Sequence, residues 1–191
     1  MKRYLVILCI AALWTATLAQ DMRRRPIVVP SGGTITITTT NRVGVSESAG
    51  VVTKTAVDGW GNAGYSSVES ITGDGWIEWT VTETNTDRMV GLSQSDPNQA
   101  IASEEFSWYQ AAGSGTESLT IYESGGTGFG NFGPYVANTT VLRIERVGST
   151  ITYYKDGVSK RAVTGATTNP LIVDVTMYTN GATVGPITMN Q

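Results

Sequence analysis

Residues 141–158 read VLRIERVGSTITYYKDGV, and this stretch decides the fold. The apolar residues Leu142 and Ile144 alternate with the charged residues Arg143 and Glu145. Alternation with a period of two is typical of a strand that buries one face. A Gly-Ser pair and an Asp-Gly pair then supply two tight turns. The stretch therefore predicts consecutive antiparallel strands.

The same pattern continues through most of the chain from Thr34 onward. In WIEWTVTET (76–84) and LIVDVTMY (171–178), apolar residues again occupy alternate positions. Gly, Asn or Asp interrupts the alternation about every eight to twelve residues, which is typical of a sandwich or barrel of short strands. No stretch of about ten or more residues has the apolar spacing of a helix. We expect an all-β fold with nearly no helix, and a core that contains three large side chains: Trp79, Phe106 and Trp108.

The first residues, MKRYLVILCIAALWTATLAQ (1–20), have the order of a secretory signal. Lys2 and Arg3 precede an apolar run, and small residues follow up to Ala19. The apolar run is shorter than the ~20 residues that span a bilayer. We therefore predict a signal peptide over residues 1–19, no membrane span after its cleavage, and a secreted or cell-surface protein.

Charge and composition narrow the function classes. Without residues 1–19 the chain keeps 11 basic and 16 acidic side chains, a formal net charge of −5, with no histidine and no cysteine. An acidic balance disfavours nucleic acid and anionic membranes as partners. The lack of cysteine excludes a disulfide framework. Stability must come from a packed core over residues 34–191, preceded by an extended leader over residues 20–33.

Two hexapeptides, GWGNAG (59–64) and GFGNFG (128–133), both satisfy the G-x-G-x-x-G pattern of a dinucleotide-binding loop. That pattern works where a buried strand leads into a helix, whose N-terminal amides face the pyrophosphate. The residues after both hexapeptides have no helical spacing, so neither predicts a nucleotide site.

Three segments together resemble modules of the concanavalin A-like lectin/glucanase superfamily. They are TKTAVDGWGNAGYSSVESITGDGWIEWTVTETNTDRMVGLS (53–93), LRIERVGSTITYYKDGV (142–158) and PLIVDVTMYTNGATV (170–184). The resemblance covers about residues 43–189 and implies a single domain, a two-sheet antiparallel β-sandwich of the jelly-roll type. It implies little about function, because lectins, glycosidases and laminin G-like adhesion modules share this fold. By the resemblance, GWGNAG is a structural corner, and GFGNFG lies in a variable loop better suited to recognition.

Enzymatic activity is not expected. The lack of histidine removes the Ser-His-Asp triad and His-based zinc sites. Carboxylate-pair glycosidase chemistry survives, but the superfamily's E-x-D-x-E strand motif is absent. Two acids from different strands, such as Glu145 and Asp174, remain the alternative. For cofactors we expect none, although a structural Ca²⁺ held by turn carboxylates is left open, with four candidates: Asp58, Asp74, Asp87 and Asp96.

The leading hypothesis is a non-catalytic carbohydrate-binding or adhesion module. Aromatic rings stack on sugars while polar neighbours fix the hydroxyls. Outward strand positions and the GFGNFG loop supply the candidate ligand-binding residues: Trp76, Glu78, Tyr122, Phe129, Asn131, Phe132, Arg143, Glu145, Asp174 and Tyr178. Six of these are expected on one open sheet face: Trp76, Glu78, Arg143, Glu145, Asp174 and Tyr178. The partner would be an extracellular glycan or a surface protein.

The alternative is a structural or protein-adhesion subunit that assembles through its β-rich N-terminal segment. TITITTT (34–40) follows a Pro/Gly-rich leader and could add as a strand to a neighbour's sheet edge or to the chain's own. The sequence does not give the oligomeric state.

Overall fold

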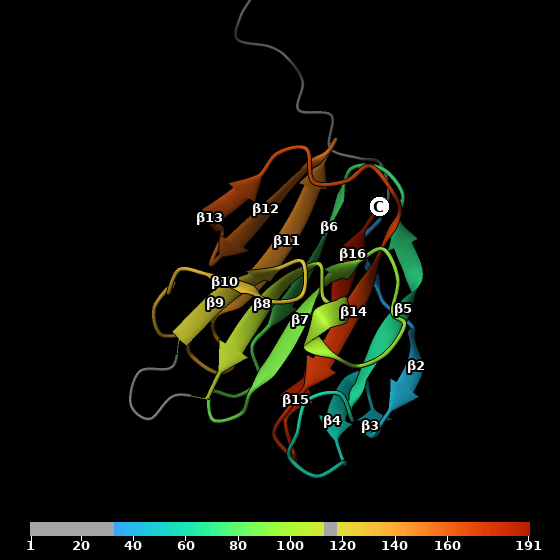
Figure 1. Ribbon diagram of the computed structural model, residues 1–191, viewed down its shortest axis with the longest axis vertical. Helices are drawn as coiled ribbons and strands as arrows, with labels where there is room; N and C mark the ends of the chain where they lie inside the picture. Colours follow the sequence, from blue (N-terminus) through green and yellow to red (C-terminus); the bar gives the residue numbers. More distant parts are fainter. Residues whose placement is uncertain (1–32, 113–117) are drawn as a thin grey trace, which may run out of the picture. The chain divides into compact units, whose positions relative to one another are not determined.

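The computed structural model describes residues 33–112 and 118–191, which form an antiparallel β-sandwich (Figure 1). The predicted signal peptide, and the leader up to residue 32, lie outside the described residues. Helix is limited, within the described part, to a three-residue 3-10 turn, η1 (Ile101–Ser103). No described helix is long and apolar enough to cross a membrane. The prediction of an all-β fold is confirmed.

Two large sheets and one small sheet make up the fold. Sheet A has the order β1 (Ile35–Thr36), β16 (Thr188–Asn190), β6 (Gly75–Thr80), β11 (Val141–Val147), β12 (Thr150–Lys155) and β13 (Val158–Val163). Sheet B has the order β10 (Thr127–Phe129), β9 (Ser118–Glu123), β8 (Phe106–Ala111), β7 (Arg88–Ser93), β14 (Leu171–Met177), β5 (Gly64–Ile71) and β2 (Thr39–Val43). Sheet C joins β15 (Thr183–Val184), β4 (Val51–Lys54) and β3 (Val45–Ser48).

The core lies between sheets A and B. The predicted inward residues are buried, among them Ile77, Trp79, Leu142 and Ile144. Trp108 of sheet B is fully buried, and its ring meets Tyr153 of sheet A edge-on with centroids 5.9 Å apart. Because the apolar faces of the two sheets meet here, the opposite faces of both sheets are left for other contacts.

The β-rich N-terminal segment pairs within its own chain. Ile35–Thr36 pairs with β16 of sheet A, and Thr39–Val43 pairs with β5 of sheet B. Residues 35–43 thus contribute an edge strand to each large sheet. The segment that the assembly alternative requires is therefore already paired with strands of its own chain.

Candidate functional site

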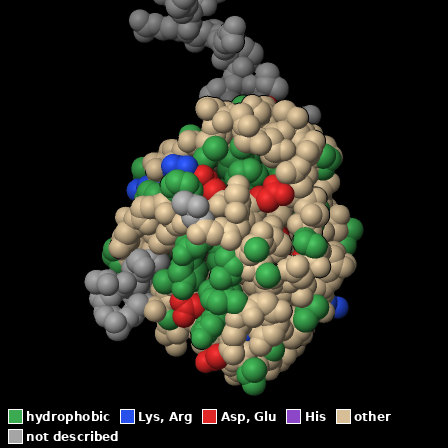
Figure 2. Space-filling model, viewed as in Figure 1, with side chains coloured by type: hydrophobic (Ala, Val, Ile, Leu, Met, Phe, Trp, Pro, Cys, Tyr) green, Lys and Arg blue, Asp and Glu red, His purple; other side chains and the backbone are tan. Residues whose placement is uncertain are grey.

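An open hollow lies on the outer face of sheet B. It is lined by Trp60, Met89, Ile101, Tyr109 and Tyr122 and has a volume of about 80 Å³. Figure 2 shows hydrophobic side chains gathered over β7 and β8, with acidic side chains at the edge of the patch. Enclosed ligand pockets typically measure roughly 300–1,000 Å³. This hollow suits a molecule that lies across the surface rather than one that is enclosed.

Strand alternation and two loops bring these side chains together. Met89 of β7 is directly opposite Tyr109 of β8, and Tyr122 comes from the next strand, β9. Met89 is 1% exposed and forms the floor, while the aromatic residues are half-buried. Trp60 comes from the loop between β4 and β5, and Ile101 from η1.

The aromatic rings of this face form a continuous surface. Trp60 lies 5.3 Å from Tyr178 and 5.9 Å from Tyr109, centroid to centroid. Tyr109 in turn meets Tyr122 edge-on at 5.5 Å. Such geometries are the favoured ones for ring pairs. We call Trp60, Tyr109, Tyr122 and Tyr178 the aromatic surface.

Asp87 holds the aromatic surface in place. The Tyr109 hydroxyl donates to Asp87 Oδ1 over 2.6 Å, and the backbone N–H of Ala112 donates to the same oxygen over 3.1 Å. Burial, followed by the bond to Asp87, raises the pKa of Tyr109. The backbone carbonyl of Asp87 accepts the N–H of Tyr178 over 3.0 Å. One residue therefore fixes two of the four rings.

Glycines shape the loop that carries Trp60. Gly59 and Gly61 have φ of 148° and 80°, which side-chain-bearing residues rarely adopt. The N–H of Gly59 donates to the carbonyl of Tyr178 over 2.9 Å. The prediction of a tight corner at GWGNAG is confirmed, but the corner also presents its tryptophan to the hollow. Sequence reasoning missed Trp60 and Tyr109 as site residues, although the Gly-Trp-Gly triplet was a usable signal for Trp60.

Three carboxyl groups have buried oxygens around the segment between β7 and β8: Asp96 and Glu104 belong to that segment, and Asp174 comes from β14. Glu104 and Asp174 are 0% and 2% exposed, and five carboxyl oxygens of Asp96, Glu104 and Asp174 have no hydrogen-bond partner. Burial, reinforced by Asp96, raises the pKa of Asp174 to about 7. Burial, reinforced by Asp174 and Asp96, raises the pKa of Glu104 well above its usual value. The raised pKa values of Glu104 and Asp174 favour their neutral forms, and neither residue lines a hollow.

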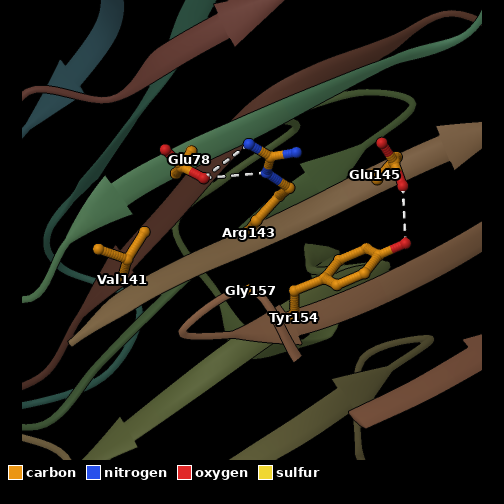
Figure 3. Close-up of a pocket in the computed structure, with 6 residues that line it drawn as sticks. All are labelled: Glu78, Val141, Arg143, Glu145, Tyr154 and Gly157. Carbon is orange, nitrogen blue, oxygen red and sulfur yellow. Dashed lines mark hydrogen bonds and ion pairs between the residues drawn. The ribbon is translucent and has the colours of Figure 1, made fainter. Parts of the chain in front are cut away.

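A second hollow, of about 200 Å³, lies on the outer face of sheet A (Figure 3). Its polar side chains bond to one another. Both Nε and Nη2 of Arg143 lie 2.9 Å from Glu78 Oε2, and the Tyr154 hydroxyl donates to Glu145 Oε2 over 2.8 Å. The Arg143 guanidinium also covers the ring of Trp76, 4.2 Å from its centroid. The remaining lining residues are Val141 and Gly157.

The expectation of one open sheet face is wrong. Trp76, Glu78, Arg143 and Glu145 gather on sheet A, as register pairs of β6 and β11. Asp174 and Tyr178 belong to sheet B and its edge, together with Tyr122. A single strand pattern gives the face on which a residue lies, but not the sheet. For the same reason Glu145 and Asp174 do not converge.

The GFGNFG loop packs against the protein. The Arg161 guanidinium lies 3.8 Å from the Phe129 ring centroid, and Phe132 meets the core residue Trp108 edge-on at 5.4 Å. Asn131 Oδ1 accepts the backbone N–H of Gly133 over 2.9 Å. Both phenylalanines are partly buried against the core. The loop therefore offers no free aromatic ring pair for recognition.

Three of the four candidate Ca²⁺ ligands are engaged within the chain, whereas the carboxyl oxygens of Asp96 are buried without a hydrogen-bond partner. Carboxyl oxygens of Asp58, Asp74 and Asp87 accept hydrogen bonds from Asn180, Gly148 and Tyr109 respectively. Among the described residues, no three acidic side chains are grouped so that they could hold a metal ion. The donor set as arranged does not fit a Ca²⁺ site.

In sequence, the chain matches no family model and no curated protein. Its structure is similar to a legume lectin-like domain from Entamoeba histolytica (TM-score 0.54, 10% identity, covering 82% of this chain and 90% of that one). It is also similar to the VIP36 exoplasmic/lumenal domain bound to Ca²⁺ and Man3GlcNAc (0.56, 10%, 81% and 82%). A third similar structure is the TRIM65 PSpry domain (0.52, 12%, 82% and 91%). All are concanavalin A-like folds. The described chain is therefore a concanavalin A-like jelly roll.

Proposed function

We propose that this protein is a non-catalytic carbohydrate-binding module, and that sugar rings stack on the aromatic surface of sheet B. One observation carries the proposal: four half-buried rings, Trp60, Tyr109, Tyr122 and Tyr178, form a continuous surface around an open hollow. Apolar sugar faces need ring area. The shallow hollow favours a polysaccharide chain over an enclosed small sugar.

The hollow of sheet A is the weaker candidate for sugar stacking. Trp76 is already covered by Arg143, whose charge is engaged by Glu78. A sugar that stacks there would have to displace the guanidinium and break that ion pair. The predicted ligand residues Trp76, Glu78, Arg143 and Glu145 are therefore assigned to a secondary surface, where an adhesion partner could bind.

Structural neighbours support a carbohydrate ligand. The VIP36 domain has been seen with Man3GlcNAc and with Man2, and the Entamoeba domain is legume lectin-like. At 8–12% identity this likeness concerns the fold. The ligand class is proposed from the aromatic surface of this chain, and mannose oligosaccharides become the first probes to try.

We propose binding without catalysis because the carboxylates that line a hollow, Glu78 and Glu145, are engaged by Arg143 and Tyr154. Hydrolysis of a bound polysaccharide that is abolished by Glu78→Gln or Glu145→Gln would contradict this. We also propose metal-independent binding. A VIP36 domain has been seen with Ca²⁺, whereas the acidic side chains of residues 33–112 and 118–191 form no group of three that could hold a metal ion.

The module is proposed to act outside the cytosol, as a secreted or surface protein of one domain over residues 34–191. Export with removal of residues 1–19 is tested by N-terminal sequencing of the exported chain, which should begin at Gln20.

The alternative function, a structural subunit built by strand exchange, requires residues 35–43 to leave their own sheets. Concentration-dependent assembly that is lost on deletion of residues 20–41 would favour it.

The test is a matched pair of tryptophan variants. Affinity for a polysaccharide panel that includes mannose oligosaccharides is measured by isothermal titration for wild type, Trp60→Ala and Trp76→Ala. We expect Trp60→Ala to lose about tenfold or more, since buried aromatic anchors each contribute roughly 1–2 kcal/mol or more. Trp76→Ala should stay within about twofold. Equal losses, or no binding by the wild type, would contradict the proposal.

A further inference from the structure

Lys54, at the end of β4, is a buried cation that is not itself part of the aromatic surface. The residue is 1% exposed. Its Nζ donates to the Gly59 carbonyl (2.8 Å), to Asn62 Oδ1 (2.6 Å) and to the Met177 carbonyl (2.8 Å). An ammonium has three N–H donors. All three are used, and all three acceptors are uncharged.

These acceptors lie on the two sides of one ring contact. Gly59 and Asn62 flank Trp60 in its loop, and Met177 directly precedes Tyr178, the ring 5.3 Å from Trp60. The backbone of Lys54 is tied to the same region, since its N–H donates to Ala182 O over 2.9 Å and its carbonyl accepts Gly181 N–H over 3.0 Å. One side chain therefore joins β4, the Trp60 loop and the end of β14.

Burying an ammonium here is unfavourable on its own. Burial lowers the pKa of Lys54, and the charge of Asp58 offsets this only in part. The buried ammonium of Lys54 is stabilised by its three acceptors. The acceptors in turn depend on Lys54, because a buried carbonyl without a donor is destabilising. The side-chain amide of Asn62 also donates through Nδ2 to Val57 O over 3.0 Å, a bond within the loop itself. Asn180, just after β14, bonds the start of the loop through Asp58 and the carbonyls of Thr55 and Ala56. Lys54 is the side chain that links the part of the loop around Trp60 to the end of β14.

We propose that Lys54 is a positioning residue: its ammonium holds the Trp60 loop against the end of β14 and so sets the orientation of the ring on which a sugar would stack. This role in binding rests on the proposed function. The geometric part, that Lys54 orients Trp60, does not depend on any ligand.

The experiment uses three variants and one control. Lys54→Met removes the ammonium and keeps the chain length, while Asn62→Ala removes one acceptor. Asn62→Asp keeps an oxygen for Lys54 and serves as the conservative rescue. Lys160→Met, an exposed lysine on β13 of sheet A, is the matched control. Two quantities are measured: the NMR signal of the Trp60 indole N–H, assigned with Trp60→Phe, and affinity for the polysaccharide that binds wild type best.

Lys54→Met and Asn62→Ala should shift or broaden the Trp60 indole signal and leave those of Trp79 and Trp108 in place. Both should weaken binding by about tenfold, as much as Trp60→Ala. Asn62→Asp should recover most of the loss, and Lys160→Met should behave as wild type. If Lys54→Met does not fold, the comparison of Asn62→Ala with Asn62→Asp still tests the positioning role.

An unchanged Trp60 signal in folded Lys54→Met and Asn62→Ala would overturn the positioning role, whatever binds. If the signal moves but wild type binds no polysaccharide, the proposed function fails while the positioning role of Lys54 stands. If the signal moves and affinity stays unchanged, the role of Lys54 in binding is overturned.

Discussion

At the scale of single residues, the aromatic surface depends on polar anchors beneath it. The Tyr109 ring is oriented by a hydroxyl bond of 2.6 Å to Asp87, and Trp60 lies between glycines whose φ values permit its corner. Rings that are held in place lose little freedom when a ligand binds. The anchors therefore matter for binding although no sugar would touch them.

Tyr109→Phe separates the ring from its anchor. The ring area is kept, while Asp87 Oδ1 retains only the Ala112 N–H at 3.1 Å. We expect unfolding to cost about 1 kcal/mol less and polysaccharide affinity to fall by roughly twofold to fivefold. Urea unfolding and isothermal titration measure the two effects. A Tyr109→Phe protein that binds as weakly as Tyr109→Ala would show that the hydroxyl itself contacts the ligand.

At this scale, the sequence does not predict the hydrogen-bond partners of buried cations. Alternation places Arg146 on the same face as Leu142 and Ile144, and it is indeed 1% exposed. Its guanidinium donates to the carbonyls of Gly73, Asn169 and Ile71. Nothing in the local sequence of Arg146 or Lys54 indicates which distant carbonyls await a donor. Their acceptors come from turns and strand ends that only the folded chain brings together.

At the scale of elements, the segment between β7 and β8 covers part of sheet B. Thr176 Oγ1 donates to Gln99 O over 2.5 Å, and Ser93 Oγ donates to Ser103 O over 3.1 Å. The buried Glu104 belongs to this segment and the buried Asp174 to β14, and Ile101 of the segment borders the hollow. The charge state of the buried carboxyl groups therefore bears on a wall of the proposed site.

The segment between β7 and β8 should contribute less to the free energy of unfolding as pH rises. The folded pKa of Asp174, about 7, lies above its usual value of 3.8, so the folded protein retains a proton that the unfolded chain releases. This contribution to stability is fully present below about pH 4 and is lost as pH rises towards 7. Around the carboxyl group of Asp174 the charged neighbours are Asp96, Glu104 and Glu105, all acidic.

Asp174→Asn and Glu104→Gln test this. Each should raise the free energy of unfolding at pH 8 by roughly 1–3 kcal/mol relative to wild type and change it little at pH 4. Urea unfolding at both values gives the comparison, with Glu145→Gln on sheet A as control. If wild type and both variants share one pH dependence, the buried carboxyl groups do not titrate as described.

Strands were predictable where the alternation of apolar and polar residues lay within a single strand. The alternation in residues 76–84 and 141–158 correctly gave buried and outward positions. In residues 171–178 it put Asp174 and Thr176 on the outward face, but they are 2% and 1% exposed, because the segment between β7 and β8 covers that face. Pairing between distant strands was not predictable, since register carries no local mark. Hence Tyr178 and Trp76 were grouped on one face, whereas β14 lies in sheet B and β6 in sheet A.

At the scale of the whole molecule, the two sheets present two outer faces of different chemistry. Sheet A shows charged side chains that pair with each other, and sheet B shows rings around a hollow. The core between them explains why the resemblance gave the jelly roll correctly while leaving the ligand open. Fold follows from the inward residues, whereas the site depends on loops such as GWGNAG.

The central claim, that sheet B is the sugar-binding face, is tested most directly by mapping a titration. ¹⁵N-labelled protein is titrated by NMR with the best-binding soluble oligosaccharide of the panel, starting with mannose oligosaccharides, with and without EDTA. We predict shifts confined to Trp60, Tyr109, Tyr122, Tyr178 and their neighbours, unchanged by EDTA. Shifts centred on Trp76, Arg143 and Glu145, or shifts that vanish with EDTA, would contradict the account.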